Sequence, residues 1–493
     1  MKDNEVRRDG GRGVGAPNNT EEAGELTRED PVEGRGRQVT ELLEGKMTDT
    51  SGSQNISTRQ QQIAALARQN PEMGFTSLNH HIDLIWLREA YRQTRKDAAA
   101  GVDGQSADDY AANLEANLQD LLERAKSGRY RAPALRRVHI PKGDGQSRPI
   151  AVPTFEDKIL QRAITMVLEP IYEQDFLDCS YGFRPGRSAH QALEAFWRQA
   201  MNMGGCWVIE LDIKSYFDTV DRTQLREFLH RRVRDGVVLR LIGKWLNAGV
   251  LERGVLSHPD AGTPQGGVAS PLLANIYLHH VLDVWFEADV IPRLKGQAFL
   301  VRFADDAILC FSQEADARRV LEVLPKRFAK YGLTLHPDKT RLIDFRKPYP
   351  PPGMPSGGKG IRPGNFDLLG FTHYWGASKR NNWVIKRKTA KGRFTRAVRA
   401  VADWCRDNRH LPIKDQHTTL CKKIAGHCGY YGITGNSIAL SRFVYAVKTR
   451  WRYWLVRRSR AAHRTWDWFN DLLKRFPLPQ PICVHSIYRA AKP

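Results

Sequence analysis

The sequence predicts an α+β protein in which a part containing strands is followed by a basic, mainly helical domain. Two observations carry this prediction. Short β-prone runs alternate with helix-length segments between about residues 136 and 375, and residues 376–493 hold 26 Lys and Arg against 5 Asp and Glu. At 493 residues the chain is long enough for two or three domains, each with its own hydrophobic core.

The first 60 residues are rich in Gly, Glu, Asn and Thr and have few large apolar side chains, so we expect a disordered tail over 1–60. From about residue 57, the segment STRQQQIAALARQ has helical apolar spacing after Ser and Thr residues that can cap a helix. A second helix is predicted over 76–97. A third is predicted over YAANLEANLQDLLERAKSG, with Gly128 as its stop.

The segment from 136 to 375 is predicted to alternate strands with helices. Runs rich in β-branched and aromatic residues predict strands over 136–142, 148–153, 207–213, 299–303, 307–311, 340–345 and 367–375. Apolar periodicity predicts helices over 156–176, 222–233, 270–290 and 315–332. The Pro- and Gly-rich segment 347–364 is expected to be a surface connector. Beyond Trp375 the strand signals fade, so a domain boundary is predicted near residue 376.

Composition excludes several classes of protein. No apolar stretch approaches the roughly 20 residues that a membrane helix needs. The first residues, MKDNEVRRDGGRGVG, lack the apolar core of a secretory signal, and the acidic content argues against an organellar transit peptide. We therefore expect a cytoplasmic protein whose seven cysteines, which include no CxxC pair, are reduced and mostly buried. A zinc site can be drawn from Cys421, His427, Cys428, Cys483 and His485, but its spacing fits no standard pattern.

The net charge of +22 comes almost entirely from the last quarter of the chain, because residues 376–493 alone carry +21. That segment also holds six tryptophans, several interleaved with arginine as in RWRYWLVRRSR (450–460). Arginine and lysine neutralise phosphates, and aromatic rings stack on bases, so this composition favours binding of a nucleic acid. The alternative is a basic helical domain with solvated arginines and with its tryptophans in the core.

Two adjacent carboxylates, Asp305 and Asp306, lie between the β-prone runs FLVRF and AILCF, where a hairpin turn would present both. Aspartate is common in turns, so the pair alone is weak evidence. The strand WVIELDI ends near a third carboxylate, Asp212, and pairing of that strand with the hairpin would bring all three to one sheet edge. Three such charges require cations, and Mg²⁺ prefers oxygen ligands. Two Mg²⁺ ions about 4 Å apart form the clamp used in phosphoryl transfer.

A series of sequence blocks resembles those of reverse transcriptases, and specifically the group II intron-encoded reverse transcriptase/maturase family. The resemblance runs from about residue 78 to at least 475. Its blocks are RRVHIPKGDGQSRPIAVPTFEDKILQRAI (136–164), CSYGFRPGRSAHQAL (179–193), LDIKSYFDTV (211–220), GTPQGGVASPLLANIYL (262–278), RFADD (302–306), LHPDKTRLIDF (335–345), FDLLGF (366–371) and GHCGYYGITGN (426–436). Phe303 stands where the family more often has Tyr, which keeps the ring and both carboxylates.

The resemblance implies a right-hand polymerase, with fingers and an antiparallel palm sheet followed by an α-helical thumb. The implied division is an N-terminal extension and fingers over 61–200, a palm over 201–375 and a thumb/maturase domain over 376–493. The C-terminal endonuclease domain carried by many relatives is expected to be absent. The implied activity is RNA-directed DNA synthesis with two Mg²⁺ ions, for which Mn²⁺ would substitute.

The resemblance also implies individual roles. Asp212, Asp305 and Asp306 would be catalytic and hold the metal ions together with the backbone of Ile213. Contacts to the dNTP would come from Lys142, Arg148, Ile213, Phe217, Gln265 and Lys339. Phe217 would be the steric gate that excludes a 2′-hydroxyl, its alternative role being core packing, and Lys339 would meet the departing pyrophosphate unless it is simply solvated. Contacts to nucleic acid would come from Arg184, Arg187, Phe303, Arg450, Arg452, Arg457 and Arg458.

The implied partners are the group II intron RNA that encodes the protein, a DNA target or primer, and dNTPs. The protein would promote splicing and retrohoming within a ribonucleoprotein associated with the bacterial nucleoid, as a monomer or as a dimer on RNA. Three alternatives stay open. They are a free-standing reverse transcriptase (retron, diversity-generating or CRISPR-associated), an RNA-dependent RNA polymerase, which Phe217 disfavours, and a splicing-only maturase, which the three aspartates disfavour.

Overall fold

The computed structural model describes residues 50–141, 147–252, 254–257, 262–263, 266–353, 360–458 and 465–485. Residues 1–49 of the predicted tail lie outside the described residues, but the prediction of disorder up to residue 60 is wrong at its end. Helix α1 runs over Thr50–Gln69. Ile56, Ile63 and Ala67 are buried at helical spacing where α1 packs on α5 (Phe155–Asp175), and this apolar stripe extends the helix further than predicted.

The N-terminal helices surround α5, which is buried along most of its length. Helix α4 ends at Gly128 with φ +81°, the left-handed cap that the sequence predicts. The helix predicted over 76–97 is shorter, because the Asp83 side chain caps it by accepting a hydrogen bond from the Trp86 amide at 2.8 Å. The remaining helices here are α2 (Leu84–Gln93), α3 (Ala107–Ala111) and α4 (Leu114–Ser127).

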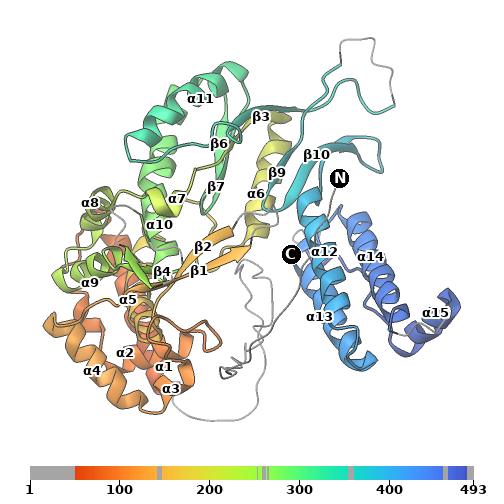
Figure 1. The fold of residues 1–493 in the computed structure, drawn as a ribbon. Coiled ribbons are helices and arrows are strands. Elements are labelled where there is room, and N and C mark those ends of the chain that lie inside the picture. Colours follow the sequence, from red (N-terminus) through yellow and green to blue (C-terminus); the bar gives the residue numbers. More distant parts are fainter. Residues whose placement is uncertain are drawn as a thin grey trace, which may run out of the picture. The chain divides into compact units, whose positions relative to one another are not determined.

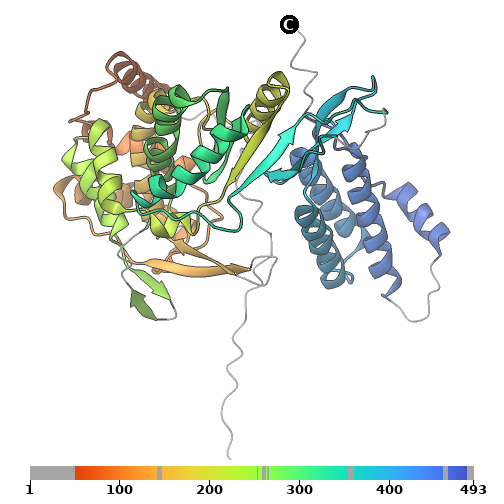
Figure 2. The ribbon, with the colours of Figure 1, turned by 90° about the horizontal axis from the view of Figure 1, so that it is seen from above.

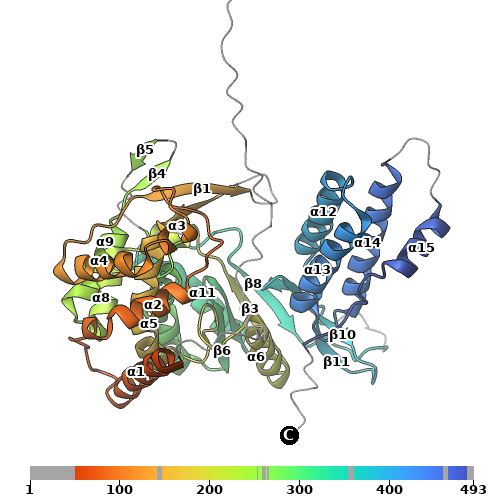
Figure 3. The ribbon, with the colours of Figure 1, turned by 90° about the horizontal axis from the view of Figure 1, so that it is seen from below.

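A small mixed sheet has the order β2-β1-β4-β5. Its two longer strands, β1 (Leu135–Pro141) and β2 (Ser147–Val152), correspond to the strands predicted over 136–142 and 148–153 and form an antiparallel hairpin. Strand β4 (Val250–Glu252) runs parallel to β1, and β5 (Val255–Ser257) completes the sheet (Figure 3).

A second sheet, in the order β6-β7-β3-β8, is antiparallel throughout and carries the predicted aspartates. The largest hydrophobic core, which includes residues of α5, α10 and α11, covers one face of this sheet. Helix α6 packs on the other face, against β3 and β6 (Figure 1). The elements are α6 (Ala189–Asn202), β3 (Gly205–Leu211), α7 (Tyr216–Thr219), α8 (Arg222–Arg232), α9 (Gly236–Leu246), α10 (Ser270–Leu278), β6 (Ala298–Phe303), β7 (Asp306–Phe311), α11 (Glu314–Ala329) and β8 (Arg341–Arg346).

The strand predicted over 367–375 is instead two strands of a third sheet. Strands β9 (Phe366–Leu368) and β10 (Phe371–Ala377) are separated by Leu369 and Gly370, whose φ values of +51° and +81° make a tight hairpin turn. Strand β11 (Trp383–Thr389) then pairs with β10, so the prediction that strands end at Trp375 is also wrong. This sheet shares a hydrophobic core with α6. A hydrogen bond also joins them, because the indole of Trp197 on α6 donates to the carbonyl of Ile385 on β11 at 3.0 Å.

Basic helices begin after the third sheet and enclose a core of their own. They are α12 (Lys391–Asp407), α13 (Ile413–Tyr431), α14 (Ser437–Val456) and α15 (Trp466–Arg475). Figure 2 shows α12, α13 and α14 alongside one another. Trp451 is fully buried between them and donates to the side-chain carbonyl of Gln416 at 2.9 Å. None of the described helices has the length and apolar character to cross a membrane.

Candidate active site

The two predicted carboxylates lie at a hairpin turn, as the sequence indicates. Phe303 pairs with Asp306, which leaves Ala304 and Asp305 as the two residues of the turn between β6 and β7. Ala304 has φ +55°, a conformation that a non-glycine residue adopts only when the surrounding structure holds it there. Asp305 is half-buried and Asp306 is exposed. The turn therefore presents two adjacent carboxylates at the edge of the sheet.

Asp212 lies at the same edge, because β3 pairs with β7. The last pair of that ladder is Leu211 with Ala307, so Asp212 follows directly on one strand where Asp306 precedes on the other. The ammonium of Lys339 is 3.3 Å from Oδ2 of Asp212, and both side chains are partly exposed. The structure thus brings together the three predicted carboxylates and one predicted cation.

The residue after Asp212 is held by main-chain hydrogen bonds on both sides. The Lys214 amide donates to the Thr334 carbonyl, and the His336 amide donates to the Asp212 carbonyl, both at 2.8 Å. The two bonds flank Ile213 and Leu335, which face each other as an isolated antiparallel pair. In this type of pair the flanking residues make the hydrogen bonds, so the Ile213 amide takes no part in them. The Ile213 side chain is buried in the main core. Its backbone is therefore fixed immediately beside the carboxylates.

The donor set at this edge suits a hard divalent cation, since it consists of carboxylate oxygens and Mg²⁺ typically takes one or two carboxylates plus substrate phosphates. Within the described ranges, no group of three or more His, Cys, Asp or Glu side chains is arranged to hold a metal ion. The Asp212 carboxylate is turned to Lys339 instead. The two-ion site stays a prediction that rests on the backbone placement and on the chemistry of the donors.

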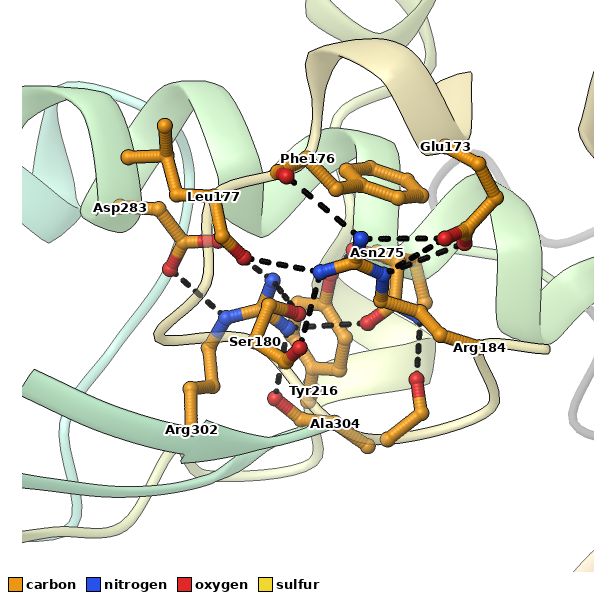
Figure 4. A network of polar contacts seen from close by, with 12 residues as sticks. Glu173, Phe176, Leu177, Ser180, Arg184, Tyr216, Asn275, Asp283, Arg302 and Ala304 are labelled. Carbon is orange, nitrogen blue, oxygen red and sulfur yellow. Dashed lines mark hydrogen bonds and ion pairs between the residues drawn. The ribbon is translucent and has the colours of Figure 1, made fainter. Parts of the chain in front are cut away.

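A buried polar network lies directly behind the turn (Figure 4). Arg302 is fully buried and forms a two-pronged ion pair with Asp283, at 2.7 and 2.6 Å. The same guanidinium donates to Asn275 Oδ1 at 2.9 Å, to Ser180 Oγ at 2.8 Å and to the Ala304 carbonyl at 3.1 Å. Arg302 therefore connects the strained turn residue to α10 and to the segment before α6.

The segment 179–187 supports the turn from the other side. The amide of Tyr181 donates to the Arg302 carbonyl, and the Arg302 amide donates to the Cys179 carbonyl, both at 2.8 Å. A Cβ on Gly182 would come within 2.3 Å of the Ala304 amide nitrogen, so only glycine fits at this contact. Arg302 and Gly182 are not among the site residues that the sequence predicts. A single charged residue in the apolar run FLVRF was the available signal, because a charge in a buried strand needs a partner.

Tyr216 closes the site on the side of α7. Its hydroxyl donates to the Ala274 carbonyl at 2.7 Å. Burial raises the pKa of Tyr216 well above its ordinary value, the Arg302 charge opposes this, and the Asp305 carboxylate adds to it. The tyrosine therefore stays a neutral donor beside Asp305.

The predicted steric gate, Phe217, is half-buried on α7. Its carbonyl accepts a hydrogen bond from the Thr263 amide at 2.7 Å, and its ring lies 5.4 Å from the ring of Tyr216. A Cβ on Gly262 would approach the Phe217 carbonyl oxygen to 2.8 Å. The ring packs partly against the main core, so its position suits both a wall of a nucleotide site and core packing.

Arg184 requires a correction. Its side chain is 3% exposed and is held by Glu173 through bonds of 3.0–3.1 Å, and by the carbonyls of Leu177 and Ser180 at 2.8 and 2.9 Å. An arginine whose donors are spent inside the protein does not bind phosphate, so we withdraw it from the nucleic-acid contacts. Arg187 is more exposed and donates to Asp178 at 2.6 Å.

Phe303 is also more enclosed than expected. Only 9% of it is exposed, in the core shared by α6 and the third sheet. The exposed ring beside it belongs to Phe183, with ring centroids 6.2 Å apart. The exposed aromatic surface near the turn is therefore mainly that of Phe183, in the GFRPGRS block. Phe183 is not among the residues predicted to contact nucleic acid.

Of the remaining predicted nucleotide contacts, the structure describes only Arg148. Arg148 is exposed on β2, opposite Ile140 on β1. Lys142 and Gln265 lie outside the described residues.

The predicted arginines of α14 have different environments. Arg450 is exposed. Arg452 stacks on Trp466 at 4.4 Å, and Arg457 lies 3.4 Å over the ring of Tyr453. Arg458, which follows the end of α14, donates to the carbonyls of Arg409 and Leu411, which anchors it to the segment between α12 and α13.

Comparison with known proteins agrees with this geometry. The family model for "Reverse transcriptase (RNA-dependent DNA polymerase)" matches residues 140–373. Protein YkfC of Escherichia coli is 41% identical over 327 residues, which is 58% of this chain and 84% of YkfC. The group II intron-encoded protein LtrA of Lactococcus lactis is 36% identical over 226 residues, covering 45% of this chain and 37% of LtrA. Nuclear intron maturase 2 of Arabidopsis thaliana is 29% identical over 231 residues, covering 39% and 30%.

The sheet, the carboxylates at its edge and the matching profile define a reverse transcriptase, an RNA-directed DNA polymerase. Within that class, the chain belongs to the group II intron-encoded reverse transcriptase/maturase family. It spans less than two fifths of LtrA, so statements about the whole relative's activity are reserved for the proposal below.

Proposed function

We propose that the protein extends a DNA primer on an RNA template by two-metal nucleotidyl transfer. A bond forms between the primer 3′-oxygen and the dNTP α-phosphorus, and pyrophosphate leaves. Asp212, Asp305 and Asp306 would hold two Mg²⁺ ions, which when bound supply the charge that activates the primer hydroxyl and stabilises the leaving oxygens. The observation that supports this most directly is the pairing of β3 with β7, which ends with Leu211 opposite Ala307. Asp212 is the next residue after Leu211, and Asp306 directly precedes Ala307.

The chain's own side chains would handle the triphosphate. Lys339, 3.3 Å from Asp212, is close enough to exchange that carboxylate for the departing pyrophosphate. The fixed backbone of Ile213 would contact the phosphates, and Lys142 and Arg148 would grip them from the hairpin of β1 and β2. Gln265 would contact the nascent base pair. Arg187 and Phe303 are proposed at the primer–template, Phe303 through the edge that it leaves exposed.

We further propose that a group II intron RNA is the cognate partner, and that the protein assists its splicing and carries it to a DNA target in a nucleoid-associated particle. The +21 charge of residues 376–493 supports this, since phosphate neutralisation dominates binding of nucleic acids. Arg450, Arg452 and Arg457 on α14 and the turn that ends it are the proposed contacts, with Arg458 instead shaping that end of the domain.

The full chain should extend a DNA primer annealed to an RNA template in the presence of dNTPs and Mg²⁺, and RNA that co-purifies with it from the host should be enriched in one structured intron. Denaturing electrophoresis of the products and sequencing of the RNA measure the two parts. Recovery of only random RNA would contradict the intron partner, and no extension of any primer would contradict the polymerase.

Replacing Phe217 with alanine should raise the incorporation of rNTPs relative to dNTPs by about 10- to 200-fold, the range that steric discrimination in a pocket provides. The measurement is kcat/KM for each nucleotide in single-addition assays. Tyr216→Phe is the matched control, because it keeps the neighbouring ring and removes only the hydroxyl bonded to Ala274. Equal selectivity in wild type and Phe217→Ala would leave Phe217 as a packing residue.

A further inference from the structure

A basic hollow of about 690 Å³ lies beside α8 and α9, at the segment that follows α4. Five of its lining residues carry basic side chains, and none is Asp or Glu. The five are Arg131, Arg226, His230, Arg240 and Lys244. We call this feature the α8–α9 hollow. None of its lining residues belongs to the predicted active site.

The concentration of positive charge is local. Residues 61–375, to which the hollow belongs, hold 41 Lys and Arg against 37 Asp and Glu, so this part of the chain is close to neutral. Other arginines of the same region are paired with carboxylates, for example Arg88 with Glu115 and Arg124 with Glu156, both at 2.6 Å. Among the described residues, the four Arg and Lys side chains of the hollow form no ion pair with a carboxylate.

The helices present these basic residues in pairs. Arg226 and His230 are four residues apart on α8, and Arg240 and Lys244 are four residues apart on α9, so each pair shares a helix face. The like charges of Arg240 and Lys244 at this spacing destabilise a helix when nothing lies between them. The side chain of Arg226 also reaches across to α9, where its Nη2 lies 3.4 Å from the position that a Cβ on Gly243 would take. Glycine at 243 leaves room for this crossing.

Lys244 is fixed at the wall of the hollow. Its ammonium donates to the carbonyls of Gly128, at 2.8 Å, and Tyr130. The adjacent Trp245 donates to the Tyr130 hydroxyl at 2.9 Å, which ties the same segment to α9. Carbonyl acceptors orient an ammonium without neutralising it, so the positive charge of Lys244 remains available to an anion.

We propose that the α8–α9 hollow binds the phosphate backbone of a folded RNA helix. This rests on the proposed function, because it assigns one contact surface for the structured RNA partner. The hollow is lined by no Phe, Tyr or Trp, whereas single-stranded RNA is recognised by stacking on such rings. Double-stranded RNA is instead recognised through its phosphates and 2′-hydroxyls, which an open set of cations on two helices suits.

The test compares the full chain with Arg226→Gln/Arg240→Gln, using a mixed-sequence 20-base-pair RNA duplex as the probe. Both side chains are exposed, so the fold should persist, which thermal unfolding checks. Affinity should fall by about tenfold, and the slope of log K against log salt should become shallower by about two. Extension of a primer on a homopolymer RNA template should stay within about twofold of wild type, since none of the lining residues contacts the carboxylate edge.

The control Arg318→Gln/Arg319→Gln removes the same charge from the exposed face of α11 and should leave duplex affinity nearly unchanged. Equal losses in the two double variants, or a normal salt slope in Arg226→Gln/Arg240→Gln, would overturn the proposal. Loss of primer extension with normal duplex binding would also overturn it, by assigning the hollow to the primer–template. Duplex binding is read without synthesis, so it remains decisive even if wild type extends no primer.

Discussion

Replacing Asp305 with alanine should lower primer extension by at least about 100- to 1,000-fold, the cost of removing one preorganised group that stabilises charge at a reacting centre. Asp305 lies in the turn, half-buried and next to Tyr216, where no other carboxylate on the turn can take its position. Its loss also removes one of the like charges at the sheet edge and leaves the buried core intact, so the protein should remain folded. Single-turnover extension and thermal unfolding measure the two effects.

Asp289→Ala is the matched control, because it removes an exposed carboxylate bonded only weakly to Arg293 and away from the sheet edge. Its activity should equal that of wild type. Asp212→Ala should resemble Asp305→Ala, and it should additionally release Lys339. Near-normal primer extension by Asp305→Ala would contradict the assignment of the catalytic centre to these carboxylates.

Breaking the buried pair between Arg302 and Asp283 should be the most destabilising single change at the site. Both side chains are fully buried, and removing one partner leaves an uncompensated charge at a cost of about 3–5 kcal/mol. Arg302→Met should therefore lower the free energy of unfolding by about that amount, as measured by denaturant unfolding. The double variant Arg302→Met/Asp283→Leu should recover part of it, because the uncompensated charge is gone, while Asn275, Ser180 and the Ala304 carbonyl still lack their donor.

Measuring primer extension shows whether Arg302 only stabilises the fold or also positions the turn. The double variant still lacks the bond from Arg302 to the Ala304 carbonyl, so kcat should remain low while stability partly recovers. Arg184→Met is the comparison, since Arg184 is also buried but bonds to Glu173, Leu177 and Ser180 rather than to the turn. Full activity in the double variant would mean that the network supports folding alone.

The sequence predicts local structure correctly where a pattern of neighbouring residues determines it. The apolar runs on either side of Asp305 and Asp306 predicted a hairpin, and the register confirms it. The sequence leaves open whether the strand before Asp212 pairs with that hairpin, and the register shows that it does. Gly128 ends α4 as predicted.

The sequence does not predict the buried ion pairs, because their partners come from different elements of the fold. Arg184 sits in a basic motif and was interpreted as a phosphate ligand, but its partner Glu173 comes from the end of α5 and only folding brings them together. Arg302 and Asp283 are likewise separated in sequence, and neither suggests the other. Leu369 is unusual at a turn that requires positive φ, which is why β9 and β10 were merged into one strand.

Helix α6 lies between two sheets, and this has a consequence for dividing the protein into fragments. Its Phe196 ring contacts both Phe345 of the second sheet and Phe366 of the third, and Trp197 bonds to β11. A cut at residue 375, where the sequence suggests a domain boundary, would strip β11 from α6 and leave an apolar surface prone to aggregation. A cut at Ala390, the single residue between β11 and α12, would keep β11 on α6, but it would separate Thr389 from its bonds to Asn436 and Leu369 from its bond to Tyr430. The third sheet therefore belongs to both parts, and neither cut leaves two self-contained fragments.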